Sequence, residues 1–389
     1  MNNETGVVIT GGDFQALAIL RSLARKNIPV IVLDSDHCIS RYSRFRKKCF
    51  KSPPASDRES YVSFLIDLAG REKINGWAIF PNSDETVYVL SRYKDNLEKF
   101  YRVPTPRWEV IQYAYIKEKT YRLAAENGIP IPTTRYPQNL RQLLALDLKF
   151  PLVIKPSIRD NFYGKVKIKG FRVNNTEELT RTYRRVCSII DPCEVIIQEL
   201  IPGGPNHLYS FCPFFKEGRS WASVTAKRSR QHPMDFGHAS TFAETVNIPE
   251  LRGIAEKFLG LIDYYGIAEV EFMKDPRDGV YKLIEVNPRF WGWHSLAIAS
   301  GVDFPYILFQ DMMGNGIEWP QASNSTKWIR LTTDIPTVFL EIMKRNMKLN
   351  DYLSSMKGKK AYAVFAADDP LPFIMEIAMI PYLWAKRGF

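Results

Sequence analysis

The segment from residue 267 to 293, IAEVEFMKDPRDGVYKLIEVNPRFWGW, constrains the fold of this chain more than any other. Apolar and polar residues alternate over 267–273 and again over 280–286, and this period of two predicts a pair of strands. The sequence DPRDG at 275–279 between them is typical of a turn. The chain is therefore expected to contain an antiparallel hairpin here.

Polar side chains stand at matching positions of this hairpin. Glu271 lies on the first strand, and alternation puts Glu285 and Asn287 on a shared face of the second. Two carboxylates and an amide oxygen form the kind of hard oxygen site that binds Mg²⁺, partly through substrate phosphates. Arg289 follows Pro288, where a guanidinium can neutralise charge on a transferred phosphoryl group. A solvated surface hairpin explains Glu271 alone, but explains poorly the charged set among apolar neighbours.

The first part of the chain predicts an open α/β domain. A short apolar run at 6–10 ends in Gly11-Gly12, an amphipathic segment with helical spacing follows, and a second apolar run covers 29–34. This β-α-β pattern implies parallel strands. Similar patterns continue to about residue 112, and a chain of 389 residues is too long for one compact core.

The middle of the chain predicts a mixed α and β region. A helix is expected at 116–127, and a buried strand at 150–157 carries Lys155. A return strand is expected at 165–173 after a polar loop. A further strand at 194–201 ends in Pro-Gly-Gly-Pro, a strong turn signal.

These motifs, in this order, resemble the ATP-grasp superfamily, whose metal site has the sequence E-x-N-x-R after a hairpin with an upstream glutamate. The resemblance covers about residues 1–300 and implies a fold of α/β and α+β class. It implies an N-terminal open parallel α/β (pre-ATP-grasp) domain followed by a two-lobed ATP-grasp fold. The expected domains are the pre-ATP-grasp domain at 1–112, the small lobe at 113–190, the large lobe at 191–325 and a partly helical C-terminal extension at 326–389.

The resemblance also implies roles for individual residues. Glu271, Glu285 and Asn287 are expected to bind two Mg²⁺ ions, with Mn²⁺ as an alternative, and Arg289 to contact the phosphates and the reacting centre. Lys155 is expected to reach the ATP phosphates from its strand and, with Arg289, to act in catalysis. A buried lysine in the sequence LVIKP needs an anionic partner, and a nucleotide phosphate is one.

Further ATP contacts are implied by position. A first lysine precedes a helix ending in G-I-P-I-P, the segment IIQELI resembles the hinge strand that holds adenine, and the loop 157–169 covers the phosphates. The expected ATP-binding residues are Lys119, Lys155, Ser157, Lys165, Glu199, Leu200, Ile201 and Asn206. The loop departs from the family pattern because it contains a single glycine, Gly164.

The substrate-binding residues rest on weaker signals. Asp84 follows a strand of the first domain, at the end of an open sheet where ligands bind. Lys227, Arg228 and Arg230 could hold a substrate carboxylate. A capped turn and a solvated strand explain these two segments about as well.

The function implied is a carboxylate–amine ligase that forms an amide or peptide bond through an acyl phosphate and releases ADP and phosphate. A bicarbonate-using carboxylase or carbamoyl-phosphate-synthase-like enzyme is the alternative within the superfamily, although no second ATP-grasp half is found. A non-catalytic nucleotide-binding module is the alternative of another class, and the complete metal-site motif counts against it.

Composition limits the partners and the location. The formal charge of +11 favours anionic partners, but no nucleic-acid motif is found, so small-molecule carboxylate and amine substrates are expected. Five cysteines without metal-site spacing and the lack of a signal peptide indicate a cytoplasmic protein, and a homodimer is one expectation. The apolar tail, 370–389, is expected to pack on the protein or on a second copy. Peripheral contact with the inner face of the membrane is the less favoured alternative.

Overall fold

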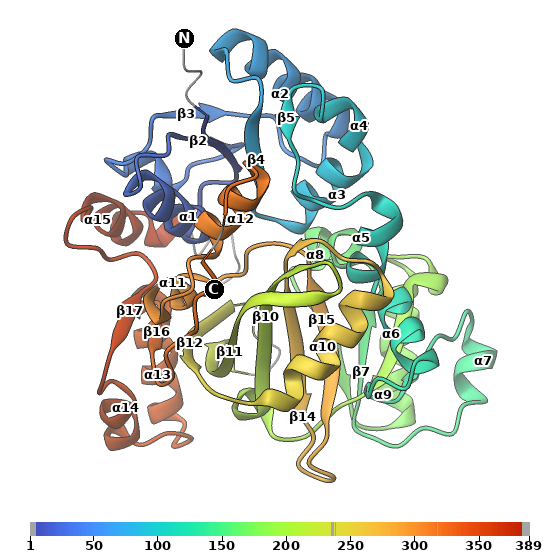
Figure 1. The fold of residues 1–389 in the computed structure, drawn as a ribbon. Coiled ribbons are helices and arrows are strands. Elements are labelled where there is room, and N and C mark those ends of the chain that lie inside the picture. Colours follow the sequence, from blue (N-terminus) through green and yellow to red (C-terminus); the bar gives the residue numbers. More distant parts are fainter. Residues whose placement is uncertain (1–4, 235–236, 238, 317, 383–389) are drawn as a thin grey trace.

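The computed structural model describes residues 5–234, 237, 239–316 and 318–382. Within these residues the strands form three sheets, which Figure 1 shows as a blue N-terminal sheet, a green sheet and a central sheet of yellow-green to orange strands. The C-terminal helices, coloured red, lie along the opposite side of the central sheet from the green sheet. The expected combination of a parallel α/β domain and a two-lobed region is confirmed.

The N-terminal sheet has five parallel strands in the order β3-β2-β1-β4-β5. The strands are β1 (Val7–Thr10), β2 (Val30–Asp34), β3 (Lys48–Lys51), β4 (Trp77–Pro81) and β5 (Tyr101–Arg102). Strands β1 and β2 are almost wholly apolar and buried, which suits a sheet covered on both faces. The strand order reverses between β1 and β4, so a crevice opens at their carboxyl ends.

Helices cover this sheet and lead into the second part of the chain. They are α1 (Phe14–Ala24), the short 3₁₀ helix η1 (Ile39–Tyr42), α2 (Arg58–Glu72), α3 (Asp84–Arg92), α4 (Lys94–Leu97) and α5 (Trp108–Tyr115). Helix α3 begins at a capping box formed by Ser83 and Thr86, which fixes the position of Asp84 at the carboxyl end of β4. Helix α1 is capped by Asp13, whose side chain accepts a hydrogen bond from the Phe14 amide.

The small lobe is a four-stranded sheet in the order β6-β9-β7-β8, with helices packed on it. Its elements are α6 (Lys117–Glu126), β6 (Thr134–Arg135), α7 (Leu140–Leu144), β7 (Leu152–Pro156), α8 (Arg159–Val166), β8 (Phe171–Val173), α9 (Thr176–Cys187), η2 (Pro192–Glu194) and β9 (Val195–Glu199). The return strand expected at 165–173 is shorter than predicted. Residues 159–166 form α8 instead. The helix ends at Lys167, which has a positive φ.

The large lobe is built on an eight-stranded sheet with the main order β15-β14-β10-β11-β12-β16-β17, and β13 pairs with β10. Its elements are η3 (Gly204–His207), β10 (Leu208–Lys216), β11 (Arg219–His232), β12 (Ala239–Thr245), α10 (Pro249–Leu261), β13 (Gly266–Ile267), β14 (Glu269–Lys274), β15 (Tyr281–Asn287), α11 (Ser295–Ser300), α12 (Phe304–Met312), β16 (Lys327–Ile329) and β17 (Lys360–Tyr362). Strands β16 and β17 follow the boundary expected at residue 325, yet they belong to this sheet.

Three further helices complete the C-terminal extension: α13 (Leu331–Met343), α14 (Leu349–Ser355) and α15 (Leu371–Ala378). Helix α15 lies beside η1 and α1 (Figure 1). Phe373 and Met379 pack against the hydrophobic core that contains α1, and Glu376 is buried in an ion pair with Arg330. The tail therefore packs on the protein through one side of α15.

The other side of α15 remains exposed. Leu371, Ile374 and Ile377 are about half exposed, whereas a helix wholly embedded in the protein would bury them. Residues 383–389 of the apolar tail, including Trp384 and Lys386, lie outside the described residues. In the described part of the chain, no helix has both the length and the apolar character needed to cross a bilayer.

Candidate active site

The acidic hairpin forms as the alternation of residues predicted. Glu271 on β14 is directly opposite Glu285 on β15, and Glu269 is directly opposite Asn287. All four side chains lie on one face, because successive residues of a strand point to opposite faces and these positions differ by two. The Asn287 amide nitrogen donates to Glu269 Oε2 at 3.1 Å and to Glu271 Oε1 at 2.9 Å. The amide thus holds two carboxylates together.

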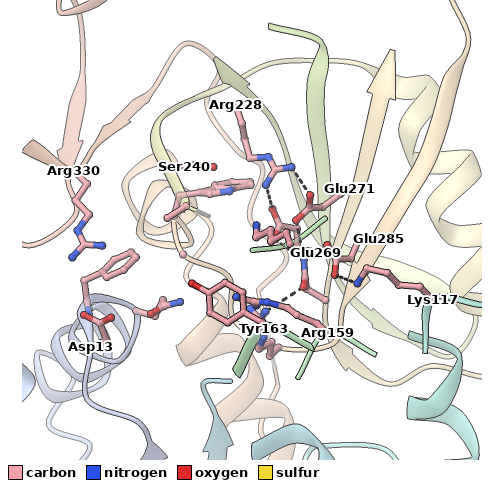
Figure 2. Close-up of a pocket in the computed structure, with 18 of the residues that line it drawn as sticks. Asp13, Lys117, Arg159, Tyr163, Arg228, Ser240, Glu269, Glu271, Glu285 and Arg330 are labelled. Carbon is pink, nitrogen blue, oxygen red and sulfur yellow. Dashed lines mark hydrogen bonds and ion pairs between the residues drawn. The ribbon is translucent and has the colours of Figure 1, made fainter. Parts of the chain in front are cut away.

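Each of the two opposed carboxylates is paired with a cation from a different element. Lys117, the first residue of α6, donates to Glu285 Oε1, and Arg228 on β11 donates to Glu271 Oε2 (Figure 2). Burial alone would raise the pKa of Glu285, but Lys117 holds that pKa far below its ordinary value. The Lys117 ammonium thus favours the charged form of Glu285, whereas burial and repulsion from Glu271 raise the pKa of Glu269 to about 7.

Arg289 joins this region to the N-terminal domain. Its Nε and Nη2 donate to Asp84 Oδ1 at 2.5 Å and to Asp84 Oδ2 at 3.1 Å, and Nη2 also donates to Asn287 Oδ1 at 3.2 Å. Arg159 on α8 approaches the same Asp84 carboxylate at 3.4 Å. Burial would raise the pKa of Asp84, but the two arginines more than offset this, so its pKa lies below the ordinary value. Asp84 is therefore an anion clamped between two guanidinium groups.

A cavity of about 350 Å³ opens over these residues, and we call it the catalytic cavity (Figure 2). Its charged lining contains six basic side chains, Lys117, Arg159, Lys169, Arg228, Arg289 and Arg330, and four acidic ones, Asp13, Glu269, Glu271 and Glu285. Basic groups outnumber acidic groups, so the cavity suits ligands that carry several negative charges, as phosphates and carboxylates do.

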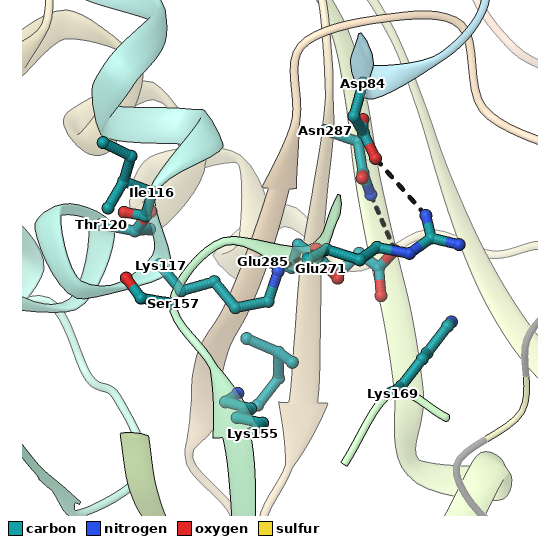
Figure 3. Close-up of polar contacts among 12 residues, drawn as sticks. Asp84, Ile116, Lys117, Thr120, Lys155, Ser157, Lys169, Glu271, Glu285 and Asn287 are labelled. Carbon is teal, nitrogen blue, oxygen red and sulfur yellow. Dashed lines mark hydrogen bonds and ion pairs between the residues drawn. The ribbon is translucent and has the colours of Figure 1, made fainter. Parts of the chain in front are cut away.

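Two partly buried lysines beside the hairpin have depressed pKa values. Burial, followed by repulsion from Lys117, lowers the pKa of Lys155 to about 7, and its ammonium donates to the Tyr121 hydroxyl at 2.6 Å. Burial, followed by repulsion from Arg159, lowers the pKa of Lys169 to about 8. Figure 3 shows both lysines near the two glutamates. An anionic ligand at this place would restore their full charge.

Comparison with known proteins bears on what the site does. No protein-family model matches the chain. The D-aspartate ligase of Enterococcus faecium (strain Aus0004) is 23% identical over 372 residues, which covers 89% of this chain and 86% of that protein. The carbamoyl phosphate synthase large chain of Sulfurisphaera tokodaii is 22% identical over 320 residues, which covers 78% of this chain and 29% of that protein.

Solved structures show the same fold. The L-amino acid ligase from Bacillus licheniformis matches with a TM-score of 0.62 at 15% identity, covering 80% of this chain and 75% of that one. N5-carboxyaminoimidazole synthetase from Staphylococcus aureus in complex with ADP matches with a TM-score of 0.66 at 14% identity, covering 88% and 86%. The biotin carboxylase from Campylobacter jejuni matches with a TM-score of 0.66 at 17% identity, covering 81% and 72%.

This chain has the ATP-grasp fold. The superfamily resemblance inferred from the hairpin motif is thereby confirmed. The roles expected of individual residues are not tested by these comparisons, and the geometry shows only which of them this ATP-grasp protein brings together.

The structure gathers the expected metal and catalytic residues around one cavity. Glu271, Glu285, Asn287 and Arg289 line the catalytic cavity, and Arg228 lines it as well. Lys155 lies beside them on β7, and Ser157 is buried, where its hydroxyl accepts a hydrogen bond from the Glu118 amide at the start of α6. Asp84 lies at the cavity edge through its contacts with Arg289.

Two of the expected ATP lysines are placed elsewhere in this ATP-grasp protein. Lys119 is exposed, and its ammonium donates to Gln112 Oε1 at 2.5 Å. Lys117, two residues earlier, reaches Glu285 instead, because two residues correspond to about 200° around a helix. Lys165 on α8 donates to the Ile189 carbonyl at 2.9 Å, away from the catalytic cavity, whereas Lys169 lines it.

The expected hinge residues follow β9, but their side chains are engaged in other ways. The Glu199 carboxylate pairs with Lys282 and Arg277, both at 3.1 Å. The Leu200 amide donates to the Pro151 carbonyl at 3.1 Å. Ile201 is buried and Asn206 is exposed on η3; none of these hinge residues is among those that line the catalytic cavity.

Of the three basic residues expected to hold a substrate, the structure brings one to the cavity. Arg230 forms two hydrogen bonds with Asp334, at 2.8 and 2.9 Å, and is buried away from the lining. That prediction is corrected by the structure, because the Arg230 guanidinium is paired with Asp334 and does not line the catalytic cavity. Lys227, also on β11, is not among the residues that line the catalytic cavity.

Several charged lining residues were not predicted, among them Glu269, Lys117, Lys169 and Arg330. Glu269 could have been found, because it shares a face with Glu271 by alternation. Predicting Lys117 would have required the rotation of α6 about its axis. Predicting Lys169 would have required the path of the chain after α8. Arg330 follows β16, more than forty residues after the hairpin, and no local sequence pattern indicates that it lines the cavity.

The donor set fits Mg²⁺, which this ATP-grasp protein would hold through Glu271, Glu285 and Asn287. Two carboxylates and an amide oxygen on adjacent strand positions are hard oxygen ligands. In the described residues, no three His, Cys, Asp or Glu side chains are gathered as a metal-binding group. Mg²⁺ usually completes its coordination with water and substrate phosphates.

Proposed function

We propose that this protein is an ATP- and Mg²⁺-dependent carboxylate–amine ligase that forms an amide or peptide bond and releases ADP and phosphate. The single observation that carries the proposal is the catalytic cavity. It combines a hard oxygen donor set, Glu271, Glu285 and Asn287, with basic side chains suited to phosphates and a carboxylate. The names of two similar proteins, a D-aspartate ligase and an L-amino acid ligase, support the same class of reaction.

In the proposed reaction, a carboxylate oxygen of the acid attacks the γ-phosphorus of ATP and ADP leaves. The amine nitrogen then attacks the carbonyl carbon of the acyl phosphate, the bond from that carbon to the phosphate oxygen breaks, and phosphate and one proton are released. Neither step needs a nucleophile from the protein. Positioning and electrostatic stabilisation supply the rate enhancement.

The chain's own residues would perform these two tasks. Lys155 and Lys169 would contact ATP phosphates, because each is a partly buried cation whose charge an anion would stabilise. Arg289 would contact the transferred phosphoryl group and is held in place by Asp84. Magnesium, when bound, supplies neutralisation of the phosphate charge.

Arg228 and Arg330 are the candidates for binding the acid. Both line the catalytic cavity, and Arg228 Nε has no hydrogen-bond partner among the described residues although it is buried. A substrate carboxylate could accept that hydrogen bond. The name of the similar D-aspartate ligase makes D-aspartate the first acid to test.

The C-terminal extension supports a finer proposal about location, contact with an anionic lipid surface. Ten of its large apolar side chains are exposed: Ile335, Phe339, Leu340, Met343, Leu349, Leu353, Phe365, Leu371, Ile374 and Ile377. Exposed basic residues accompany them, including Lys344, Arg345, Lys348, Lys357 and Lys359. Apolar side chains flanked by lysine and arginine match the acyl boundary and the charge of an anionic membrane surface.

The test of the reaction is release of ADP and phosphate with MgATP across a panel of amino acids, hydroxy acids and bicarbonate. Hydroxylamine is added to trap the acyl phosphate as a hydroxamate. We expect ADP, phosphate and a hydroxamate with at least one amino acid. AMP and pyrophosphate as the main products would overturn the acyl-phosphate mechanism. Turnover with bicarbonate alone would favour the carboxylase alternative.

A further inference from the structure

A second cavity adjoins the catalytic cavity and lies on the N-terminal domain. It is larger, about 450 Å³, and opens at the carboxyl ends of β1, β2 and β4, where the strand order reverses. We call it the crevice cavity. Open α/β sheets bind ligands at such a place because loops diverge there and leave polar backbone groups accessible. Arg289 is the residue of the family motif that lines this cavity.

The crevice cavity has the opposite charge to its neighbour. Five acidic side chains line it, Asp13, Asp34, Asp84, Glu85 and Asp160, with two basic ones, Arg159 and Arg289. Asp84 is paired with both arginines, and the lining carries three more acidic side chains than basic ones. The cavity is therefore suited to a cation.

Two of these carboxylates show the effect of the missing cation. Glu85, in the first turn of α3, makes no hydrogen bond or ion pair with a described residue. Asp160 on α8 accepts a hydrogen bond from the Tyr115 hydroxyl at 2.9 Å. Partial desolvation, followed by repulsion from Asp160 and Asp84, raises the pKa of Glu85, and burial, followed by repulsion from Asp84, raises the pKa of Asp160. A bound cation would relieve this repulsion.

A separate observation indicates that the ligand donates hydrogen bonds. Asn82, which follows β4, is 8% exposed, lines the crevice cavity, and has an Oδ1 atom without a hydrogen-bond partner in the described structure. A buried amide oxygen that is left unpaired is destabilising. The amide packs against Gly11, whose φ of +112° disfavours any residue with a side chain.

The two cavities share one wall. Asp13, Gln15, Arg159, Tyr163 and Arg289 line both of them. A molecule in the crevice cavity therefore lies next to the place where the phosphoryl group would be transferred. Anionic ligands fit one side of this wall and a cationic ligand fits the other.

We propose that the crevice cavity binds the amine substrate as its ammonium form or through a cationic group, with Glu85, Asp160 and the Asn82 amide oxygen as its partners. This inference rests on the proposed ligase function and names the place and the charge of the second substrate. An amine held there approaches the acyl phosphate from the side of the N-terminal domain, across the wall formed by Arg289.

The test separates the two half-reactions. With MgATP and the acid that supports turnover, hydroxylamine reports formation of the acyl phosphate. Ethanolamine, glycinamide and L-lysinamide are then added as competitors of hydroxylamine. The variants are Glu85→Gln and Asn82→Ala. The matched control is Glu59→Gln, because Glu59 is also an exposed glutamate in the first turn of a helix of this domain.

We expect at least one amine to suppress hydroxamate formation, with an inhibition constant raised tenfold or more in Glu85→Gln and Asn82→Ala and unchanged in Glu59→Gln. Hydroxamate formation without competitor should stay within twofold in Glu59→Gln, and each inhibition constant is measured against the variant's own rate without competitor. Competition that is equal in every variant, or no competition by any amine, would overturn the proposed subsite. Absence of ADP release and hydroxamate with every acid would instead overturn the ligase function itself.

Discussion

Asp84 and Arg289 are joined by two hydrogen bonds that cross from the N-terminal domain to the large lobe. The carboxylate fixes a guanidinium that lines both cavities. An arginine held in this way does not turn toward solvent when substrates are absent. The entropy cost of ordering its side chain is therefore incurred in folding and not in substrate binding.

Asp84→Asn should therefore lower kcat by about 10- to 100-fold, because Arg289 would lose its charged partner and shift. The KM for ATP should change little, since Lys155 and Lys169 are not among the partners of the Asp84 carboxylate. Steady-state ADP release measures both quantities. Asp95→Asn is the control, because that carboxylate forms an exposed ion pair with Arg107 and should leave kcat within about twofold. An unchanged kcat in Asp84→Asn would contradict the positioning role.

Glu285→Gln and Asn287→Ala should each reduce ATP turnover by at least about 100-fold while the protein stays folded, because each removes an oxygen ligand of the proposed metal site. Turnover is measured at saturating Mg²⁺, and circular dichroism reports folding. Glu98→Gln, a largely exposed glutamate paired with Lys94, serves as the control. Near-normal turnover in either site variant would show that the metal assignment is wrong.

Lys155→Ala should weaken ATP binding by about 1.5–3 kcal/mol, which is typical for loss of a charge-assisted hydrogen bond. Lys117→Ala should also weaken binding, because Lys117 faces Glu285 in the catalytic cavity. Lys119→Ala should have almost no effect, since that ammonium contacts Gln112 on the surface. Calorimetry compares the three variants. Equal affinities for Lys155→Ala and Lys119→Ala would refute the role given to Lys155.

Nucleotide binding should take up protons above neutral pH. The pKa of Lys155 is about 7 and that of Lys169 about 8 in the free protein, so both are largely neutral at pH 8.5. Phosphates favour the charged form, so binding raises these pKa values and affinity falls as the pH rises from about 7.5 to 9.

Calorimetry at pH 8.5 in HEPES and in Tris measures this proton uptake, because the two buffers release protons with different enthalpies. Lys155→Ala should reduce the uptake. Identical binding enthalpies in the two buffers would mean that these lysines do not titrate on binding.

The protein should bind vesicles that contain 30% phosphatidylglycerol and be released by salt, because basic residues accompany the exposed apolar side chains. Flotation separates bound from free protein. Phe339→Ser with Ile374→Ser should abolish binding, while Leu144→Ser with Leu261→Ser, at exposed apolar positions outside the extension, should not. A chain that stays unbound in flotation would contradict the membrane proposal. A dimer in sedimentation analysis that Phe339→Ser with Ile374→Ser converts to a monomer would also contradict it.

Regular patterns in the chain predicted most of the elements. The β-α-β unit that begins the chain and the hairpin of Glu271 and Glu285 follow from periodicities that depend on local sequence. The superfamily resemblance followed from the same hairpin. Boundaries were less accurate where no residue marks them, as for the strand expected at residue 165 that begins at Phe171.

The parts of the site that could not be predicted depend on rotation and on distance along the chain. Whether Lys117 or Lys119 faces the catalytic cavity depends on the rotation of α6 about its axis. The positions of the two lysines in the sequence do not define that rotation. The pairing of Arg230 with Asp334 depends on a helix that begins a hundred residues later. The crevice cavity joins ends of several strands, and no contiguous motif describes such a place.

The ion pair between Arg330 and Glu376 makes helix α15 a support for the wall of the catalytic cavity, although it lies almost ninety residues beyond the motif. An exchange of lobes between relatives, by natural recombination or in a laboratory chimera, must therefore carry both residues together. A donor segment that ends between residues 330 and 376 would deliver the complete motif and Arg330 without its counter-charge, Glu376. The segment of this protein that can be exchanged as a whole is therefore longer than the segment that carries the motif.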